Sequence, residues 1–164
     1  MRMVGIVMGS ASDLPVVEKA TATFDSLGVP YEVHVYSAHR TPVQAAQFAL
    51  QARDRGFGAI IAVAGMAAHL AGAIAANTTL PVIGIPCRSS NLDGLDALLS
   101  TVQMPSGIPV ATVAIDGGKN AALLAAQILA VEDSQLACKL DELRRAEAAK
   151  ALESDCQVFE KYNK

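Results

Sequence analysis

The stretch Val4-Gly-Ile-Val-Met-Gly-Ser-Ala-Ser-Asp13 decides the fold of this chain, because an apolar run ends there in small hydroxyl residues and a carboxylate. Met3 to Met8 is apolar on both faces apart from one glycine, which is typical of a central parallel strand covered by helices on each side. A helix follows, with Ser12 or Asp13 as its N-cap and Pro15 in its first turn. The sequence therefore predicts a strand, a tight loop and a helix.

Gly9 to Asp13, the loop between them, has two interpretations. A helix start offers unpaired backbone N–H groups and a partial positive charge, so it stabilises a bound anion such as phosphate. Many loops of this kind, however, carry glycine and serine only to make the turn and cap the helix. The loop alone leaves both interpretations open.

Length, charge and cysteine content restrict the class of protein. A chain of 164 residues suits one domain that buries about 70% of its unfolded surface. The net charge is −3, Lys and Arg do not cluster with aromatic residues, and there is neither a long apolar segment nor a signal peptide, so we expect no nucleic acid and no membrane as partners. Cys87, Cys138 and Cys156 lack the spacing of a disulfide framework or a zinc site, which favours a cytoplasmic location.

Strand and helix signals alternate along the chain. This alternation predicts an α/β fold with a parallel, doubly wound sheet, right-handed crossovers and ligands outside the carboxyl ends of the strands. The predicted strands are 3–8, 31–36, 59–64, 82–86 and 110–115, and the predicted later helices are 42–55, 67–76, 94–103 and 121–131.

A helical tail is predicted over residues 134–164, after a catalytic part at 1–133. Its apolar residues recur at helical spacing as Leu136, Leu140 and Leu143 and again as Leu152, Cys156 and Phe159. The chain contains no internal repeat or Gly/Ser-rich linker, so we expect both parts to form one domain.

Two predicted helices, 67–76 and 121–131, have almost no polar face. A helix that is apolar all round must be covered on all sides, and a subunit of this size has little material to cover both. We therefore expect a homo-oligomer in which these helices pack between subunits.

Polar residues follow the first two strands in a combination that suits a ribonucleotide. Ser10, Ser12, Ser37 and Arg40 suit the phosphate, because a guanidinium forms paired charge-assisted hydrogen bonds with phosphate oxygens. Asp13 suits the ribose hydroxyls, because a carboxylate is a pure acceptor.

His39 is the only histidine that lies between phosphate-type residues on a loop after a strand, so it is the candidate acid/base. A loop-capping or surface role is the alternative. His69 lies among Ala and Leu and is interpreted as a core histidine unless its loop exposes it, while His34 is interpreted as structural. Gly117 to Asn120 forms either a glycine turn or an anion contact.

Several well-known catalytic patterns are missing from the sequence: the Ser-His-Asp order, His-Glu-x-x-His, the Walker lysine and GxGxxG. Their absence argues against metalloproteases, P-loop enzymes and dinucleotide dehydrogenases.

Six motifs in order carry a family resemblance. They are Met8-Gly-Ser-x-Ser-Asp13, Ser37-Ala-His-Arg-Thr-Pro42, Ala67-Ala-His-Leu70, Leu80-Pro-Val-Ile-Gly84, Gly94-Leu-Asp-x-Leu-Leu99 and Val102-Gln-Met-Pro105. Through them the chain resembles the bacterial N5-carboxyaminoimidazole ribonucleotide mutases of purine (IMP) biosynthesis. The resemblance implies a flavodoxin-like three-layer α/β/α sandwich, an octamer whose tail helix reaches over neighbouring subunits, and neither a metal nor an organic cofactor.

The resemblance also implies roles for individual residues. His39 would be the general acid/base of a reaction that moves a carboxylate from N5 to C4 of the aminoimidazole ring, through CO2 and the free amine in a closed site. The residues implied for substrate binding are Ser12, Ser37 and Arg40 at the phosphate, Asp13 at the ribose, Ala64, Gly65, Ala67, His69 and Leu70 around the imidazole and carboxylate, and Ser10 and Ala38 beside them.

The chain departs from the family pattern at Leu14, Met66, Ala71 and Ser106, where the family commonly has Trp, Gly, Pro and Gly. Met66 is the most consequential departure, because it puts a side chain where backbone would approach the substrate. The related animal-type carboxylases carry Lys at the position of Arg40, so Arg40 favours the mutase. His69, in the motif Ala67-Ala-His-Leu70, favours the mutase as well.

Three hypotheses follow from the sequence. The first is the mutase, the second is a carboxylase that takes free CO2, and the third is a nucleotide-binding module without catalysis. The third explains the phosphate loops but not a histidine between Ser37 and Arg40.

Overall fold

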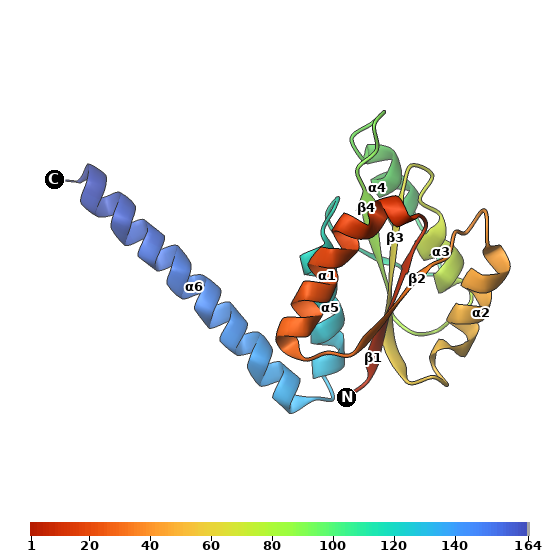
Figure 1. Ribbon diagram of the computed structural model, residues 1–164, viewed down its shortest axis with the longest axis horizontal. Helices are drawn as coiled ribbons and strands as arrows, with labels where there is room; N and C mark the ends of the chain where they lie inside the picture. The colour runs from red at the N-terminus through yellow and green to blue at the C-terminus, as the bar shows by residue number, and fades with distance from the viewer. Residues whose placement is uncertain (164) are drawn as a thin grey trace.

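A five-stranded parallel sheet with the order β2-β1-β3-β4-β5 forms the centre of the computed structural model, which describes residues 1–163 (Figure 1). The strands are β1 Met3–Met8, β2 Tyr31–Val35, β3 Phe57–Gly65, β4 Val82–Cys87 and β5 Ala111–Thr112. β2 and β3 lie on opposite sides of β1, so the loops that leave these strands diverge and open a crevice at their carboxyl ends.

Helices cover both faces of the sheet, which confirms the predicted three-layer fold. The helical elements are the short 3-10 helix η1 Ala11–Asp13, α1 Leu14–Leu27, α2 Pro42–Ala52, α3 Leu70–Ala75, α4 Leu95–Val102, α5 Gly118–Ala130 and α6 Ser134–Tyr162. α1 and α5 lie on one face, α2 and α3 lie on the other, and α6 projects away from the body (Figure 1).

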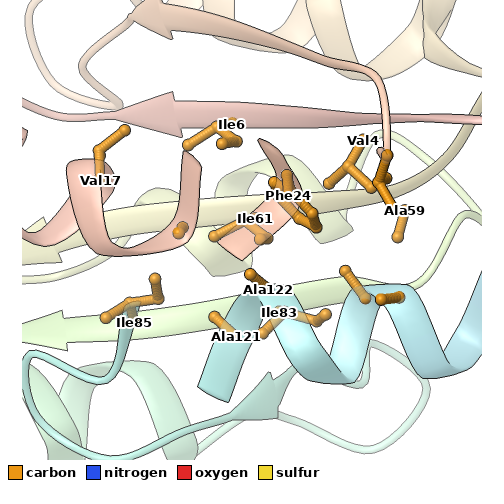
Figure 2. Packing of buried hydrophobic residues seen from close by; sticks show 14 of the residues in the cluster. Val4, Ile6, Val17, Phe24, Ala59, Ile61, Ile83, Ile85, Ala121 and Ala122 are labelled. Carbon is orange, nitrogen blue, oxygen red and sulfur yellow. The ribbon is translucent and has the colours of Figure 1, made fainter. Parts of the chain in front are cut away.

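The core under α1 and α5 is formed by branched strand residues and small helix residues. Ile6, Ile61 and Ile83 are fully buried against Phe24 of α1 and against the alanines of α5 (Figure 2). α5 begins with Gly118, where an added Cβ would lie 2.2 Å from the carbonyl oxygen of Val16. The absence of a side chain at Gly118 therefore allows α5 to pack against the backbone of α1.

A second core lies on the opposite face, around Phe48 and Phe57. Their rings pack edge to face with centroids 5.4 Å apart. Phe48 occupies the space above the one glycine of β1, since a Cβ added at Gly5 would lie 2.7 Å from Cζ of Phe48. The glycine inside the first strand is thus explained by this ring.

The observed elements differ from the predicted ones mainly at their ends. A short 3-10 turn, η1, with Ser10 as its N-cap precedes α1. α1 itself has the predicted N-cap Asp13 and a proline in its first turn, although the Asp13 side chain makes no capping hydrogen bond. Residues 67–69 form a turn before α3, α2 ends at Ala52, and β5 has only two residues because it pairs with β4 solely at Ile83 and Gly84.

The argument that helices 67–76 and 121–131 need a second subunit as cover is wrong. Every residue of α5 from Ala121 to Ala130 is buried or partly buried within one chain, because α1, the sheet and the start of α6 surround it. α3 likewise buries Leu70 and Ile74 inside the subunit. Within residues 1–163, no helix combines the length and apolar character that crossing a membrane requires.

α6 packs on the body only through its first turns. Asp133 caps it by accepting a hydrogen bond from the backbone N–H of Leu136 (3.0 Å), and Leu136 and Leu140 are its buried residues. Lys119 of α5 contacts Glu147 at 2.8 Å, and every described residue after Leu143 is exposed.

Candidate functional site

The loops that follow β1, β2, β3 and β4 surround a cavity of about 590 Å³ at the carboxyl end of the sheet. Its lining residues are Gly9, Ser10, Ser12, Asp13, Ser37, Ala38, His39, Arg40, Ala64, Gly65, Met66, Ala67, Leu70, Arg88, Ser89 and Ser90. Eleven of the twelve predicted site residues line this cavity, and His69, the twelfth, reaches it through its contact with His39.

The first loop is held by a capping box. Ser10 Oγ accepts a hydrogen bond from the Ser12 N–H at 3.3 Å, and Asp13 Oδ2 accepts one from the Ser10 N–H at 3.2 Å. The Ser10 hydroxyl uses a lone pair in this bond, so its own hydrogen remains available to an anion. The motif that fixes the loop therefore also presents a donor to the cavity.

The second loop is organised by Ser37. Its Oγ accepts hydrogen bonds from the N–H groups of His39 (3.3 Å) and Arg40 (3.2 Å), while its own N–H donates to Thr41 Oγ1 at 2.8 Å. Thr41 thus stabilises this loop rather than capping α2 with its side chain. The arrangement holds His39 and Arg40 on one tight turn.

Arg40 joins the first two loops. Its Nη2 donates to the carbonyl oxygen of Gly9 at 2.7 Å, which places the guanidinium beside the Ser10 loop. The remaining N–H groups of the guanidinium are free to bind an anion in a paired geometry. Serine hydroxyls and a guanidinium from the loops after two separate strands therefore lie together at one cavity.

His39 and His69 are in direct contact. His39 Nε2 lies 2.9 Å from His69 Nδ1, and the two rings meet edge to face with centroids 5.0 Å apart. Both residues are exposed, so His69 is not the core histidine that its apolar neighbours suggested. One ring nitrogen donates and the other accepts, which fixes how each ring is oriented toward the cavity.

His34, in contrast, has a structural role, as predicted. It bonds Glu32 and stacks on Tyr36 with ring centroids 4.7 Å apart. Lys119, in the first turn of α5, contacts Glu147 of the tail and does not line the cavity. Gly117 is the N-cap of α5, and residues 118–120 form its first turn.

The carboxyl group of Asp13 is half-buried and has several polar partners. Burial raises the pKa of its carboxyl above the usual value, and the Ser10 N–H, the Ser12 side chain and Arg40 oppose that increase. Asp116 also raises this pKa through its charge. The half-buried carboxylate lines the cavity and can accept further hydrogen bonds there.

Arg88, Ser89 and Ser90 are cavity residues that the sequence reasoning missed. They follow β4, and Asp116 holds the start of this segment by accepting the Arg88 N–H at 3.0 Å. The rule that ligands bind outside the carboxyl ends of all strands could have identified them, although no sequence motif did.

A larger cavity of about 950 Å³ lies beside the amino end of β4, between α2, α3 and the segment before β5. It is lined mainly by apolar, threonine and asparagine side chains and has no histidine. The smaller cavity is therefore the candidate active site. In the part of the chain that the structure describes, no group of three His, Cys, Asp or Glu side chains is arranged to hold a metal ion.

Comparison with known proteins gives a consistent result. A family model described as AIR carboxylase matches residues 3–150. The N5-carboxyaminoimidazole ribonucleotide mutase of Pyrococcus horikoshii is 52% identical over 98% of this chain and 93% of its own length. The phosphoribosylaminoimidazole carboxylase of Saccharomyces cerevisiae is 54% identical over 85% of this chain, which corresponds to 24% of that longer protein.

The crystal structure of PurE from Treponema denticola has the same fold. It superimposes with a TM-score of 0.86 at 32% identity and covers 95% of this chain and 98% of the PurE chain. The family model and the relatives extend over the strand-end loops that form the cavity. The chain therefore belongs to the AIR carboxylase family.

Proposed function

We propose that the chain is a 5-(carboxyamino)imidazole ribonucleotide mutase, an isomerase of de novo purine biosynthesis. The observation that carries this proposal is the contact between His39 and His69, 2.9 Å apart beside a cavity that also contains the Ser10, Ser37 and Arg40 donors. Family membership and mutase relatives support the same activity.

The polar loops would hold the ribonucleotide. The phosphate binds between Arg40 and the serine hydroxyls at the start of η1, and Asp13 accepts hydrogen bonds from the ribose. The imidazole ring then extends toward the apolar wall of Ala64, Ala67 and Leu70. This pose puts the imidazole ring of the substrate next to His39.

His39 would act first as an acid and then as a base. As the bond between N5 and its carboxylate breaks, CO2 leaves and the nitrogen takes a proton from His39. C4 of the ring then forms a bond to CO2, and His39 removes the proton from C4, which restores its original state. His69 is the positioning partner, because its Nδ1 holds His39 Nε2 in place.

The carboxylase that takes free CO2 is the second candidate. It is supported by the yeast relative, whose name describes a carboxylase and whose matched region is as similar to this chain as the mutase is. A binding module without catalysis is less well supported, since binding a nucleotide does not require two histidines in contact.

An isotope experiment separates the two enzymes. The purified protein is given carboxyaminoimidazole ribonucleotide labelled at the carbamate, in unlabelled bicarbonate and without ATP or metal. Most of the label is expected at C4 of the product, because CO2 held beside C4 reacts faster than CO2 captured from solution. A product that takes its carboxylate from bicarbonate would instead support the carboxylase.

We place the protein in a reducing cytoplasm. Cys138 and Cys156 are exposed free thiols, which suits a compartment that keeps thiols reduced. Alkylation of cell lysates under conditions that trap the native redox state should modify both of them. Recovery of either thiol as a disulfide with a second chain or with a small thiol would argue for another compartment.

A further inference from the structure

Met66 combines a strained backbone with an exposed apolar side chain. It directly follows β3 and adopts a φ of +54°, in the left-handed region that disfavours residues with a Cβ. Its side chain is 61% exposed, so burial within the subunit does not compensate for this strain. Strained backbone of this kind is concentrated at functional sites.

The position of Met66 connects it with the candidate active site. It lines the same cavity as His39, and it belongs to the turn that leads to His69. Ala67 and Leu70 of this segment also line the cavity. Met66 therefore extends the apolar wall of the cavity outward to solvent.

CO2 is the species in the proposed reaction that polar groups hold least well, because it is small and carries no net charge. Its retention depends on walls that enclose it and on exclusion of water. A methionine suits such a wall, since its unbranched and flexible thioether adapts to irregular space.

We infer that Met66 covers the imidazole end of the bound ribonucleotide and is a specificity-determining residue that limits the escape of CO2. This inference rests on the proposed mutase function. The exposed side chain closes over the ring when the substrate binds, so carboxylate transfer competes better with exchange into bicarbonate.

The first test repeats the labelled-carbamate assay with variants. Met66→Ala and Met66→Gly should raise the ratio of exchanged to retained carboxylate about tenfold, the lower end of what one apolar contact contributes to discrimination. Met66→Leu, which keeps an apolar side chain of similar size, should stay near the wild-type ratio.

A matched control separates the side chain from the backbone strain. Asp93 also has a left-handed φ, +51°, but it is exposed and does not line the cavity. Asp93→Gly relieves comparable strain and should leave the ratio unchanged. An equal change in Asp93→Gly and Met66→Gly would overturn the inference.

The second test does not depend on turnover. Met1 and Met66 have similar exposed fractions, 58% and 61%. Saturating product should slow the oxidation of Met66 by hydrogen peroxide severalfold and leave Met1 unchanged, as measured by peptide mass spectrometry. Equal oxidation of Met66 with and without product would overturn the proposed cover.

The outcomes distinguish the two proposals. If the product of the wild-type protein takes its carboxylate from bicarbonate, the mutase function is refuted. The inference that Met66 retains CO2 is then refuted as well. Wild-type protein that retains the label while Met66→Ala retains just as much refutes only the inference about Met66.

Discussion

His39 is held by its backbone and by a second ring, so replacing its side chain should change the chemistry more than the binding. His39→Asn should lower turnover by about 10²–10⁴-fold, the usual contribution of a general acid/base, and change ribonucleotide affinity only a few fold. Steady-state kinetics and calorimetric titration measure the two effects. Normal turnover in this variant would remove His39 from the mechanism.

Arg40 provides the second prediction at this scale. A hydrogen bond to a charged group contributes about 1.5–3 kcal/mol, so Arg40→Ala should weaken ribonucleotide binding roughly 10- to 150-fold. Binding of the dephosphorylated nucleoside should change little. An equal loss for both ligands would place the phosphate elsewhere.

Glu32 gives a prediction for pH. A hydrogen bond to His34, together with a second one to Arg55, lowers the pKa of this carboxyl below its usual range. Because the pKa is lower in the folded state, Glu32 stabilises the fold above about pH 5, and this contribution is lost as pH falls through the folded-state pKa. Urea unfolding should show Glu32→Gln to be about 0.5–1.5 kcal/mol less stable at pH 7, with the difference disappearing in acid.

The same residues show how far sequence reasoning reaches. The serines, Asp13, His39 and Arg40 were predictable because each follows a strong strand signal, and parallel strands bring their carboxyl ends together. The contact between His39 and His69 was not predictable, because it joins residues 30 positions apart and depends on the conformations of two loops. The role of His69 was accordingly obscured by its apolar neighbours.

Among the elements, β1 and β3 were predicted well and β5 poorly. β3 is buried along most of its length, so its apolar run is unambiguous. Residues 110–115 have an equally strong strand composition, yet only Ala111 and Thr112 are paired with β4 as a strand, and Val113 adds a single hydrogen bond to the carbonyl oxygen of Gly84. Strand pairing depends here on the path of the chain and not on local propensity.

The junction between α1 and α5 yields a prediction at the scale of elements. Gly118→Ala places a Cβ 2.2 Å from the carbonyl oxygen of Val16, and backbone moves less readily than a side chain. Urea unfolding should show a loss of about 1–3 kcal/mol, the usual cost of overpacking. Asn120→Ala on an exposed position of the same helix should stay within about 0.5 kcal/mol.

At the scale of the whole molecule, we still predict an oligomer. The prediction now rests on the exposed apolar residues of the tail and not on helices 67–76 and 121–131. The apolar residues of the tail form two stripes. Leu136 and Leu140 face the body of their own subunit, whereas Leu152 lies 16 positions after Leu136 and therefore points about 160° away around the helix. Leu152 and Phe159 are 68% and 61% exposed, so this second stripe needs a surface outside the chain.

Light scattering of the full chain should report a closed assembly of eight copies at micromolar concentration. Removing the residues after Leu143 should weaken this assembly, because it deletes the second stripe, and it should leave the unfolding of the body nearly unchanged, because Leu136 and Leu140 remain. A stable monomer of the full chain would refute the argument from the exposed stripe.

The place of α6 after the strands and α5 in the sequence also orders events during synthesis. At about 5–20 residues per second, a ribosome needs roughly 2–6 s to translate a helix of this length after the last core helix has been made. All five strands and α5 precede it in sequence. The strands are thus synthesised seconds before the segment that we propose joins copies, so neighbouring nascent chains cannot be joined through α6 while the strands are still being made.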